Sequence, residues 1–264
     1  MAFVRVAGQL LHYRLDGPPG APALAFLNSL GTDHRIWDAL AERWSGRFRL
    51  LRYDKRGHGL SDAPDGDYSL DDHVRDLSGL LSALGIERVV PVGVSVGGLI
   101  AQAFALAEPD RLSGLVLMDT AARFGDEASW TTRIDAVRAG GMAAISRTVI
   151  ERWFDESYRT SHADDFAGWL NMLERTPAAG YAGTCATLRD TDLTDRVGRI
   201  RMKTLVLAGE ADRSTPPELV RKTAELLPYA RFELIAGAGH LPNIEAADAV
   251  ASALDRYFTE IGLV

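Results

Sequence analysis

The sequence predicts an α/β protein with one mostly parallel sheet of eight strands, helices on both faces of the sheet, and a helical insert after the sixth strand. Short apolar segments alternate with helical patterns over residues 1–120 and again over 196–264, as expected for a parallel sheet covered on both faces. Between them, residues 121–195 show no strand pattern, and apolar residues recur at helical spacing. We therefore expect an α/β core of residues 1–120 and 196–264 and a helical cap of residues 121–195.

The eight strands are expected at short apolar runs bounded by polar residues, glycine or proline. These runs are residues 4–6, 10–15, 23–27, 48–53, 88–92, 112–118, 203–207 and 232–235. One helix is expected after Thr32 or Asp33, and others start at Gly97, after Pro217 and near residue 244. A further helix, ending at Gly85, is expected to begin at Ser69, because Asp72 three residues later completes a capping box.

Composition limits the class of protein and its partners. The chain has 264 residues, is 47% hydrophobic, and carries a net charge of −7 without blocks of like charge. This balance argues against nucleic acid or an anionic membrane as a partner. Cys185 is the single cysteine, and neither a signal peptide nor a long apolar run is evident. We expect a cytoplasmic protein without internal disulfides.

One serine stands between glycines where a strand becomes a helix. The segment "VVPVGVSVGGLIAQAF" places Ser95 in a Gly-x-Ser-x-Gly motif, with Gly93 and Gly97 on either side. In a nucleophile elbow such a serine is held up by a strained turn, and the glycines keep the neighbouring backbone from clashing. The motif alone is weak, and a glycine-rich turn with an incidental serine is the alternative. The strand-to-helix context favours Ser95 as a nucleophile.

A serine nucleophile needs a base and an orienting acid, expected in the chain order serine, acid, histidine. His240, in "LIAGAGHLPNIE", lies between the last predicted strand and the last helix. A histidine exposed on a solvated loop is the alternative interpretation. Asp212 follows the seventh strand, and Asp119 ends the sixth. We favour Asp212 as the acid, because it occupies the expected place, and we expect Asp119 to cap the loop that enters the insert.

The oxyanion formed by acyl transfer needs preorganised N–H donors. We expect them to be the backbone amides of Val96, which follows the nucleophile, and of Leu30, in the loop "FLNSLGTD" after the third strand. The segment "YDKRGHGLSD" lacks the ending of a phosphate loop, so we interpret it as a turn in which Asp54 and Arg56 hold the backbone. The remaining histidines outside this turn are scattered and give no metal-ligand spacing, so no metal site is expected; they are His12, His34, His73 and His162.

These residues carry a resemblance that extends over the whole chain. The sequence resembles the α/β-hydrolases and, among them, the 3-oxoadipate enol-lactonases of the β-ketoadipate pathway of aromatic catabolism. The segments that carry the resemblance include "FLNSLGTDHRIWD", "GVSVGGLIAQ", "ERWF", "TPAAGYAGTCATL" and "GAGHLPNIE". The resemblance implies an α/β-hydrolase fold, with opening of 3-oxoadipate enol-lactone to 3-oxoadipate through an acyl-enzyme on Ser95. No cofactor is required for this reaction.

Two residues depart from the pattern of these lactonases. Val96 stands where methionine or isoleucine is usual, which affects pocket volume only, because Val96 is expected to act through its backbone. Asp119 stands where asparagine is frequent, and some branches of the superfamily place the catalytic acid there. Asp119 therefore remains a second candidate for the acid.

The lactone carries a free carboxylate, so the implied substrate is a small anion. The range 121–195 contains eight basic residues, all arginine, against twelve acidic residues. Arg133 shares a helical face with Trp130 and Ile134, so it either binds the carboxylate or pairs with a nearby acid. Trp130 and Trp153 are expected to be walls of the pocket or part of the packing inside the cap.

Other activities are compatible with the same residues. A general carboxylesterase or a cofactor-free perhydrolase would use the same serine, acid and histidine on another substrate. A ligand-binding protein that kept this fold without catalysis is a further alternative. The presence of Ser95, Asp212 and His240 together argues against it.

Overall fold

The computed structural model describes residues 2–264 and is built on one eight-stranded sheet with the order β1-β2-β4-β3-β5-β6-β7-β8. The strands are β1 (Ala2–Val6), β2 (Gln9–Asp16), β3 (Ala23–Leu27), β4 (Arg49–Tyr53), β5 (Val90–Val94), β6 (Leu115–Met118), β7 (Thr204–Gly209) and β8 (Ala230–Ile235). β2 runs antiparallel to both of its neighbours, and all other neighbouring strands are parallel. The predicted fold class, a mostly parallel eight-stranded sheet, is confirmed.

The central strands explain why the sequence shows continuous apolar runs there. Every residue of β3, β5, β6 and β7 is buried, because helices cover both faces of the sheet. β6 is shorter than predicted and begins at Leu115. Ahead of it, Leu112 forms only an isolated bridge with Val89, since Ser113 and Gly114 interrupt the apolar run and glycine weakens a strand.

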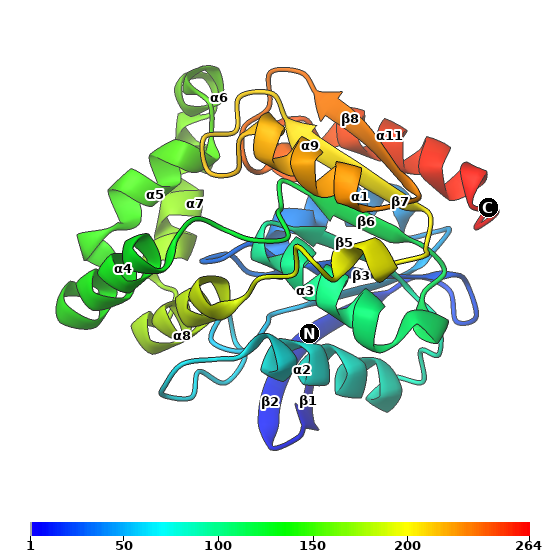
Figure 1. The fold of residues 1–264 in the computed structure, drawn as a ribbon, viewed down its shortest axis with the longest axis horizontal. Helices are drawn as coiled ribbons and strands as arrows, with labels where there is room; N and C mark the ends of the chain where they lie inside the picture. The colour runs from blue at the N-terminus through cyan, green and yellow to red at the C-terminus, as the bar shows by residue number, and fades with distance from the viewer. Residues whose placement is uncertain (1) are drawn as a thin grey trace.

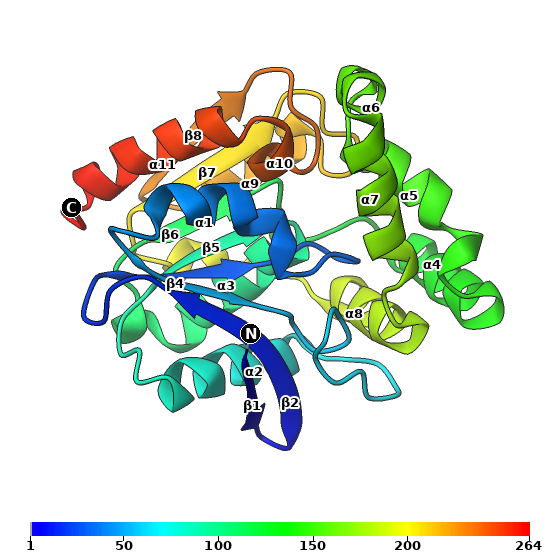
Figure 2. The ribbon, with the colours of Figure 1, turned by 180° about the vertical axis from the view of Figure 1, so that it is seen from behind.

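Two sets of helices cover the sheet (Figures 1 and 2). One face carries α2 (Leu70–Ala83), α3 (Val96–Ala107) and α9 (Pro217–Leu226), and the other carries α1 (Asp38–Trp44) and α11 (Ala247–Glu260). Ser69 forms the predicted capping box with Asp72 at the start of α2. The helix predicted from residue 244 is divided into α10 (Pro242–Glu245) and α11, because Ala246 leaves the helical conformation (φ −137°, ψ 47°).

Short 3-10 turns complete the connections. They are η1 (His34–Trp37), η2 (Pro109–Arg111), η3 (Met142–Ala144) and η4 (Val197–Arg199). The side chain of Asp33 accepts a hydrogen bond from the Arg35 N–H and so caps η1, which leads into α1. Asp33, one of the two residues predicted to start this helical segment, therefore does so.

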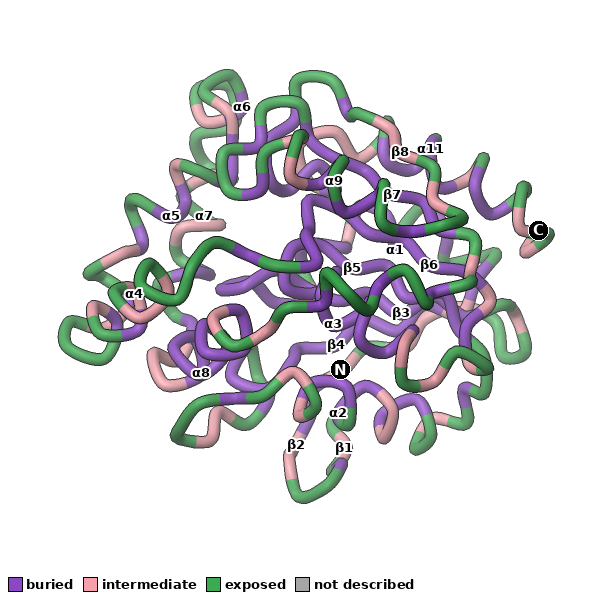
Figure 3. Tube along the Cα trace, viewed as in Figure 1, coloured by how far each residue is buried: buried purple, intermediate pink, exposed green. Residues whose placement is uncertain are grey.

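The insert between β6 and β7 consists of helices and is named the cap. Its helices are α4 (Glu127–Gly140), α5 (Ser146–Trp153), α6 (Glu156–Ser161), α7 (Ala163–Glu174) and α8 (Ala178–Asp190). They lie together at one end of the sheet (Figure 1). Within α8, residues 180–188 are all buried, whereas much of the remaining cap is exposed (Figure 3). α8 packs on α4 within the cap and on the core, where Gly180 lies against Gly57 and Gly183 against Tyr68.

Among residues 2–264, no helix has both the length and the apolar character needed to cross a membrane.

Candidate active site

Ser95 occupies a strained turn between β5 and α3. Its backbone angles are φ 58° and ψ −123°, a region that residues other than glycine rarely adopt. Its N–H donates to the Met118 carbonyl (2.9 Å), and its own carbonyl accepts from Thr120 Oγ1 (2.7 Å). A Cβ at Gly93 would lie 2.4 Å from the Gly97 carbonyl oxygen, and one at Gly97 would lie 2.1 Å from the Leu27 carbonyl oxygen. Both flanking positions therefore require glycine.

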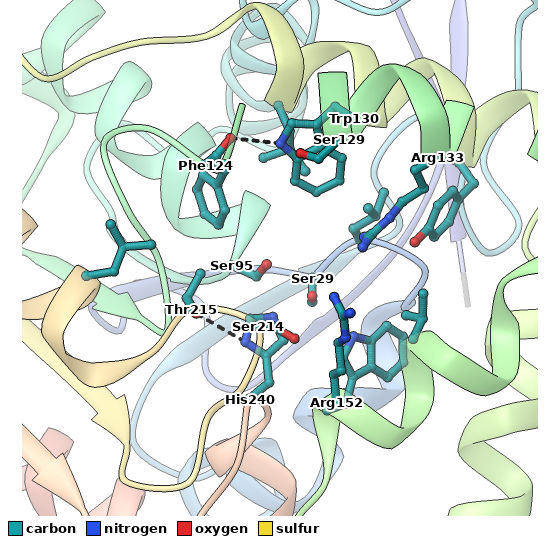
Figure 4. A pocket seen from close by; sticks show the side chains of 17 residues that line it. Ser29, Ser95, Phe124, Ser129, Trp130, Arg133, Arg152, Ser214, Thr215 and His240 are labelled. Carbon is teal, nitrogen blue, oxygen red and sulfur yellow. Dashed lines mark hydrogen bonds between the residues drawn. The ribbon is translucent and has the colours of Figure 1, made fainter. Parts of the chain in front are cut away.

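Asp212 and His240 are brought together by the loops after β7 and β8. Nδ1 of His240 lies 2.8 Å from Oδ2 of Asp212. Asp212 also accepts hydrogen bonds from the Ser214 N–H (2.7 Å) and from Thr215 Oγ1 (2.6 Å). Burial opposes the charge of Asp212, but His240 and these donors hold its pKa below the usual value. A carboxylate therefore faces Nδ1 and leaves Nε2 of His240 free to act as a base on the side of Ser95 (Figure 4).

The loop that carries His240 is attached to the cap. The His240 N–H donates to the Trp153 carbonyl (2.7 Å). The carboxylate of Glu245 accepts the N–H of Gly239 (2.8 Å), next to the histidine, and the N–H of Asp155 (3.0 Å), at the start of α6. Burial raises the pKa of Glu245 to about 7, although both N–H groups favour its ionised form. Glu245 thus ties the position of His240 to the cap.

Asp119 does not cap the loop that enters the insert, contrary to our expectation. Its side chain is fully buried at the end of β6, and Oδ1 accepts the Gly209 N–H (2.7 Å) at the end of β7. Within residues 2–264 it has no arginine, lysine or histidine partner. Burial, followed by the charge of Asp212, raises its pKa well above the usual value. Asp119 is therefore easier to protonate than an ordinary carboxyl, because its buried site offers no counter-ion and lies beside Asp212.

Two backbone N–H groups near Ser95 have no acceptor within residues 2–264. They belong to Leu30, in the loop after β3, and to Val96, the first residue of α3. Val96 N–H is free because the first turn of a helix leaves its donors unpaired. Leu30 lines the same pocket as Ser95. These are the two donors predicted from the sequence for the oxyanion.

A pocket of about 230 Å³ lies between the core and the cap (Figure 4). The residues singled out from the sequence that line it are Leu30, Ser95, Trp130, Arg133, Trp153 and His240. Sequence reasoning missed other lining residues, among them Ser29, Phe124, Arg152 and Thr215. Arg152 stands in the quoted segment "ERWF" directly before Trp153, so its neighbour could have drawn attention to it. The volume is below the roughly 300 Å³ typical of sites for drug-sized ligands, which favours a small ligand.

Two arginines of the cap reach into this pocket without an acidic partner. Four other arginines of the cap region form ion pairs with acidic side chains; they are Arg123, Arg138, Arg147 and Arg189. For Arg133 and Arg152, residues 2–264 supply no such pair. The guanidinium of Arg133 lies 4.8 Å from the ring centre of Trp130, whose Nε1 donates to the Phe124 carbonyl (2.7 Å). Both guanidinium groups point toward the middle of the pocket (Figure 4).

Two histidines that the sequence presents as scattered lie together. Nδ1 of His12 and Nδ1 of His34 lie 2.8 and 3.1 Å from the two oxygens of Asp54, so the three residues have the proximity of metal ligands. The same oxygens also accept the N–H groups of Leu60 and His34 (2.9 Å each). With both oxygens already occupied by two donors, the cluster fits a hydrogen-bonded turn rather than a metal centre.

Comparisons with known proteins agree with this geometry. Residues 24–253 match the family model described as "Alpha/beta hydrolase family". The chain is 33% identical over 238 residues to 3-oxoadipate enol-lactonase 1 of Acinetobacter baylyi, covering 90% of this chain and 89% of that protein.

Solved structures show the same relationship. The crystal structure of the enol-lactonase from Burkholderia xenovorans LB400 superposes with a TM-score of 0.95 at 35% identity, covering 98% of this chain and all of that one. A thermophilic esterase from Thermogutta terrifontis, solved with malate bound, gives a TM-score of 0.93 at 30% identity, covering 99% of each chain. The chain therefore belongs to the alpha/beta hydrolase family and is related to the 3-oxoadipate enol-lactonases.

Proposed function

We propose that this hydrolase opens 3-oxoadipate enol-lactone to 3-oxoadipate, with Ser95 as nucleophile, His240 as base and Asp212 as the orienting acid. The observation that carries the proposal is that Arg133 and Arg152, which have no acidic partner within residues 2–264, line the same small pocket as Ser95 and His240. A lactone with a free carboxylate supplies both an acyl carbon for Ser95 and an anion for the arginines. The relationship to the enol-lactonases supports this choice.

The first half of the reaction forms an acyl-enzyme. Ser95 Oγ attacks the lactone carbonyl carbon while Nε2 of His240 takes the hydroxyl proton. The N–H groups of Leu30 and Val96 hold the oxyanion. The ring C–O bond then breaks, and the leaving enol oxygen receives the proton from His240. The enol tautomerises to the ketone while the chain stays attached to Ser95 as an ester.

The second half releases the product. Water attacks the acyl carbon, His240 takes the proton of the water, and the tetrahedral intermediate expels Ser95 Oγ, which regains its proton from His240. The product carries two carboxylates, one from the substrate and one new. The arginines hold the first throughout, so the reacting carbon stays aligned with Ser95.

Turnover of 3-oxoadipate enol-lactone by the purified protein tests the proposal, beside a simple nitrophenyl ester and the Ser95→Ala variant. Rapid loss of the lactone that disappears in the variant is the expected result. If the nitrophenyl ester is cleaved and the lactone is untouched, the protein is an esterase or perhydrolase, for which the likeness to the Thermogutta esterase is the favouring observation. If neither substrate reacts, the ligand-binding alternative replaces hydrolysis.

A further inference from the structure

Lys55 lies beneath the loop that carries Leu30. Its side chain is only 2% exposed, and Nζ donates a 2.6 Å hydrogen bond to the carbonyl oxygen of Ser29. Within residues 2–264 it forms no ion pair, and the carboxylate of the preceding residue, Asp54, is occupied by His12 and His34. Burying an ammonium without a counter-ion is costly. A buried charge that lowers the stability of the fold is expected to contribute to the activity of the protein.

Lys55 donates its hydrogen bond to the carbonyl of the same peptide group that contains the Leu30 N–H. The Ser29 carbonyl and the Leu30 N–H belong to one trans peptide, so they point in opposite directions. A donor on the carbonyl polarises the peptide and makes the N–H at the other end a stronger donor, as in other hydrogen-bond chains. A charged donor does this more strongly than a neutral one.

The loop is held in place without Lys55. The Ser29 carbonyl also accepts Thr32 Oγ1 (2.9 Å) and the Thr32 N–H (3.3 Å). The Gly31 N–H donates to Nε2 of the buried His58 (2.9 Å). The side chain of Asn28 donates to the Tyr53 carbonyl (2.7 Å). The orientation of the Ser29–Leu30 peptide is therefore set by several bonds, and what Lys55 adds to them is its charge.

We propose that Lys55 is a positioning residue whose ammonium, acting through the Ser29–Leu30 peptide, strengthens the Leu30 N–H as a donor to the oxyanion. The inference rests on the proposed function only in that Leu30 and Val96 hold the oxyanion of a reaction at Ser95. It holds for any ester or lactone, because the polarised peptide contacts the acyl oxygen and not the rest of the substrate.

The charge state of Lys55 makes the effect dependent on pH. Burial lowers the pKa of Lys55 to about 7, while the charges of Asp54 and Asp33 oppose this shift. The histidines that face it are neutral, because burial holds the pKa of His58 well below its usual value and lowers that of His73 to about 3. Lys55 therefore loses its proton as the pH rises through about 7. Ser95 then loses part of its oxyanion stabilisation.

The variant Lys55→Met tests the proposal, because it keeps the length and apolar stem but removes the charge. Ser95 is labelled with a small fluorophosphonate, in which Oγ displaces fluoride and the phosphoryl oxygen takes the place of the oxyanion. We expect labelling and kcat for a nitrophenyl ester to fall about tenfold, a fraction of the loss on deleting an oxyanion donor, with KM changed less than twofold. The unfolding midpoint at pH 7 is expected not to fall, since an unpaired buried charge is removed.

Lys203→Met is the matched control, because Lys203 is exposed and precedes β7 at the opposite end of the strand from Asp212. It is expected to leave labelling, kcat and KM unchanged. The proposal is overturned if Ser95 of Lys55→Met is labelled at the wild-type rate. It is also overturned if this variant has a lower unfolding midpoint and a raised KM, because Lys55 then has a structural role. If the lactone proves not to be a substrate while labelling still depends on Lys55, the proposed substrate fails and this inference stands.

A measurement on the wild-type protein covers the case in which Lys55→Met does not fold. The chain has three lysines, Lys55, Lys203 and Lys222, so ε-¹³C-lysine labelling gives three resonances to follow by NMR. We expect one of them, absent in Lys55→Met where that variant folds, to titrate near pH 7. We expect the labelling rate of Ser95 to fall over the same pH range in which the Lys55 resonance shows loss of the proton. A labelling rate that does not fall as the Lys55 resonance loses its proton overturns the proposal.

Discussion

The two sides of the pocket are constructed differently. On the core side, Ser95, Asp212 and His240 are 6%, 4% and 2% exposed. Backbone carbonyls at the ends of β6 and β7 hold Ser95 and Asp212, and the carbonyl of Trp153 holds His240. On the cap side, Arg133 is partly buried and rests on the ring of Trp130, while Arg152 is exposed apart from its place at the pocket. Bond-making groups must be held within fractions of an ångström, whereas charge recognition tolerates looser placement. The core is thus suited to the chemistry and the cap to the choice of substrate.

The largest expected effect separates the two aspartates of the core. Asp212→Asn is expected to lower kcat about 10⁴-fold, because the amide stabilises the wrong tautomer of His240. Asp119→Asn is expected to change kcat less than about threefold, because an amide resembles the neutral carboxyl. Steady-state hydrolysis of a nitrophenyl ester measures both, with circular dichroism as the check of folding. The reverse ranking would assign the acid role to Asp119.

Removing the charges of Arg133 and Arg152 tests whether these arginines determine the preference for an anionic substrate. Arg133→Met and Arg152→Met are each expected to lower kcat/KM for the lactone about 10- to 100-fold, the equivalent of one charge-assisted hydrogen bond. Hydrolysis of an uncharged nitrophenyl ester is expected to change little. Arg147→Met is the control, because Arg147 is exposed and paired with Glu151. Equal losses on both substrates would show that the arginines shape the site rather than bind the anion.

The contact between core and cap depends on two glycines. A Cβ at Gly180 of α8 would lie 2.1 Å from the carbonyl oxygen of Gly57 in the core. Because the clash is with backbone, Gly180→Ala is expected to cost roughly 1–3 kcal/mol and to lower the unfolding midpoint by several degrees. Gly168→Ala in α7 is the control, since a Cβ there meets no atom within 4 Å. Equal midpoints for the two variants would contradict this role of Gly180.

The smallest effect concerns pH and the buried carboxyl of Asp119. Its pKa is raised in the folded protein, so the unfolded chain releases this proton first as the pH rises. The stability associated with Asp119 is complete below the carboxyl pKa of the unfolded chain, near 4, and is lost as the pH rises through the folded value. Asp119→Asn does not titrate, so its unfolding midpoint relative to wild type is expected to increase from pH 4 upward. A constant difference between the two would show that Asp119 does not carry a proton.

Much of the core could be predicted from local patterns in the sequence. The apolar runs of β3, β5 and β7 are continuous because both faces of the sheet are covered, and Ser69 with Asp72 marks the start of α2. The elbow follows from Gly93 and Gly97, where only glycine fits. In each case, residues close together in the chain carry the information, so spacing alone is sufficient.

Long-range placement was less accessible from the sequence. Asp119 was expected to cap a nearby loop, but its carboxyl accepts an N–H from Gly209, ninety residues away. His12 and His34 show no common spacing in the sequence, yet in the structure both lie within hydrogen-bond distance of Asp54. Arg152 precedes Trp153, but the sequence does not show which arginines of the cap pair with acidic side chains.

The sequence by itself determined the fold class, the helical insert and the strained turn at Ser95, because periodicity, glycine sterics and capping act over a few residues. Only the tertiary structure decided which charges remain unpaired and what they face. Arg133 and Arg152 differ from their paired neighbours only through the pocket in which the fold places them. Lys55 likewise differs from the other lysines only because pairing of β3 with β4 buries it against the carbonyl of Ser29. Burial and the absence of a counter-ion are properties of the assembled chain, so no local pattern records them.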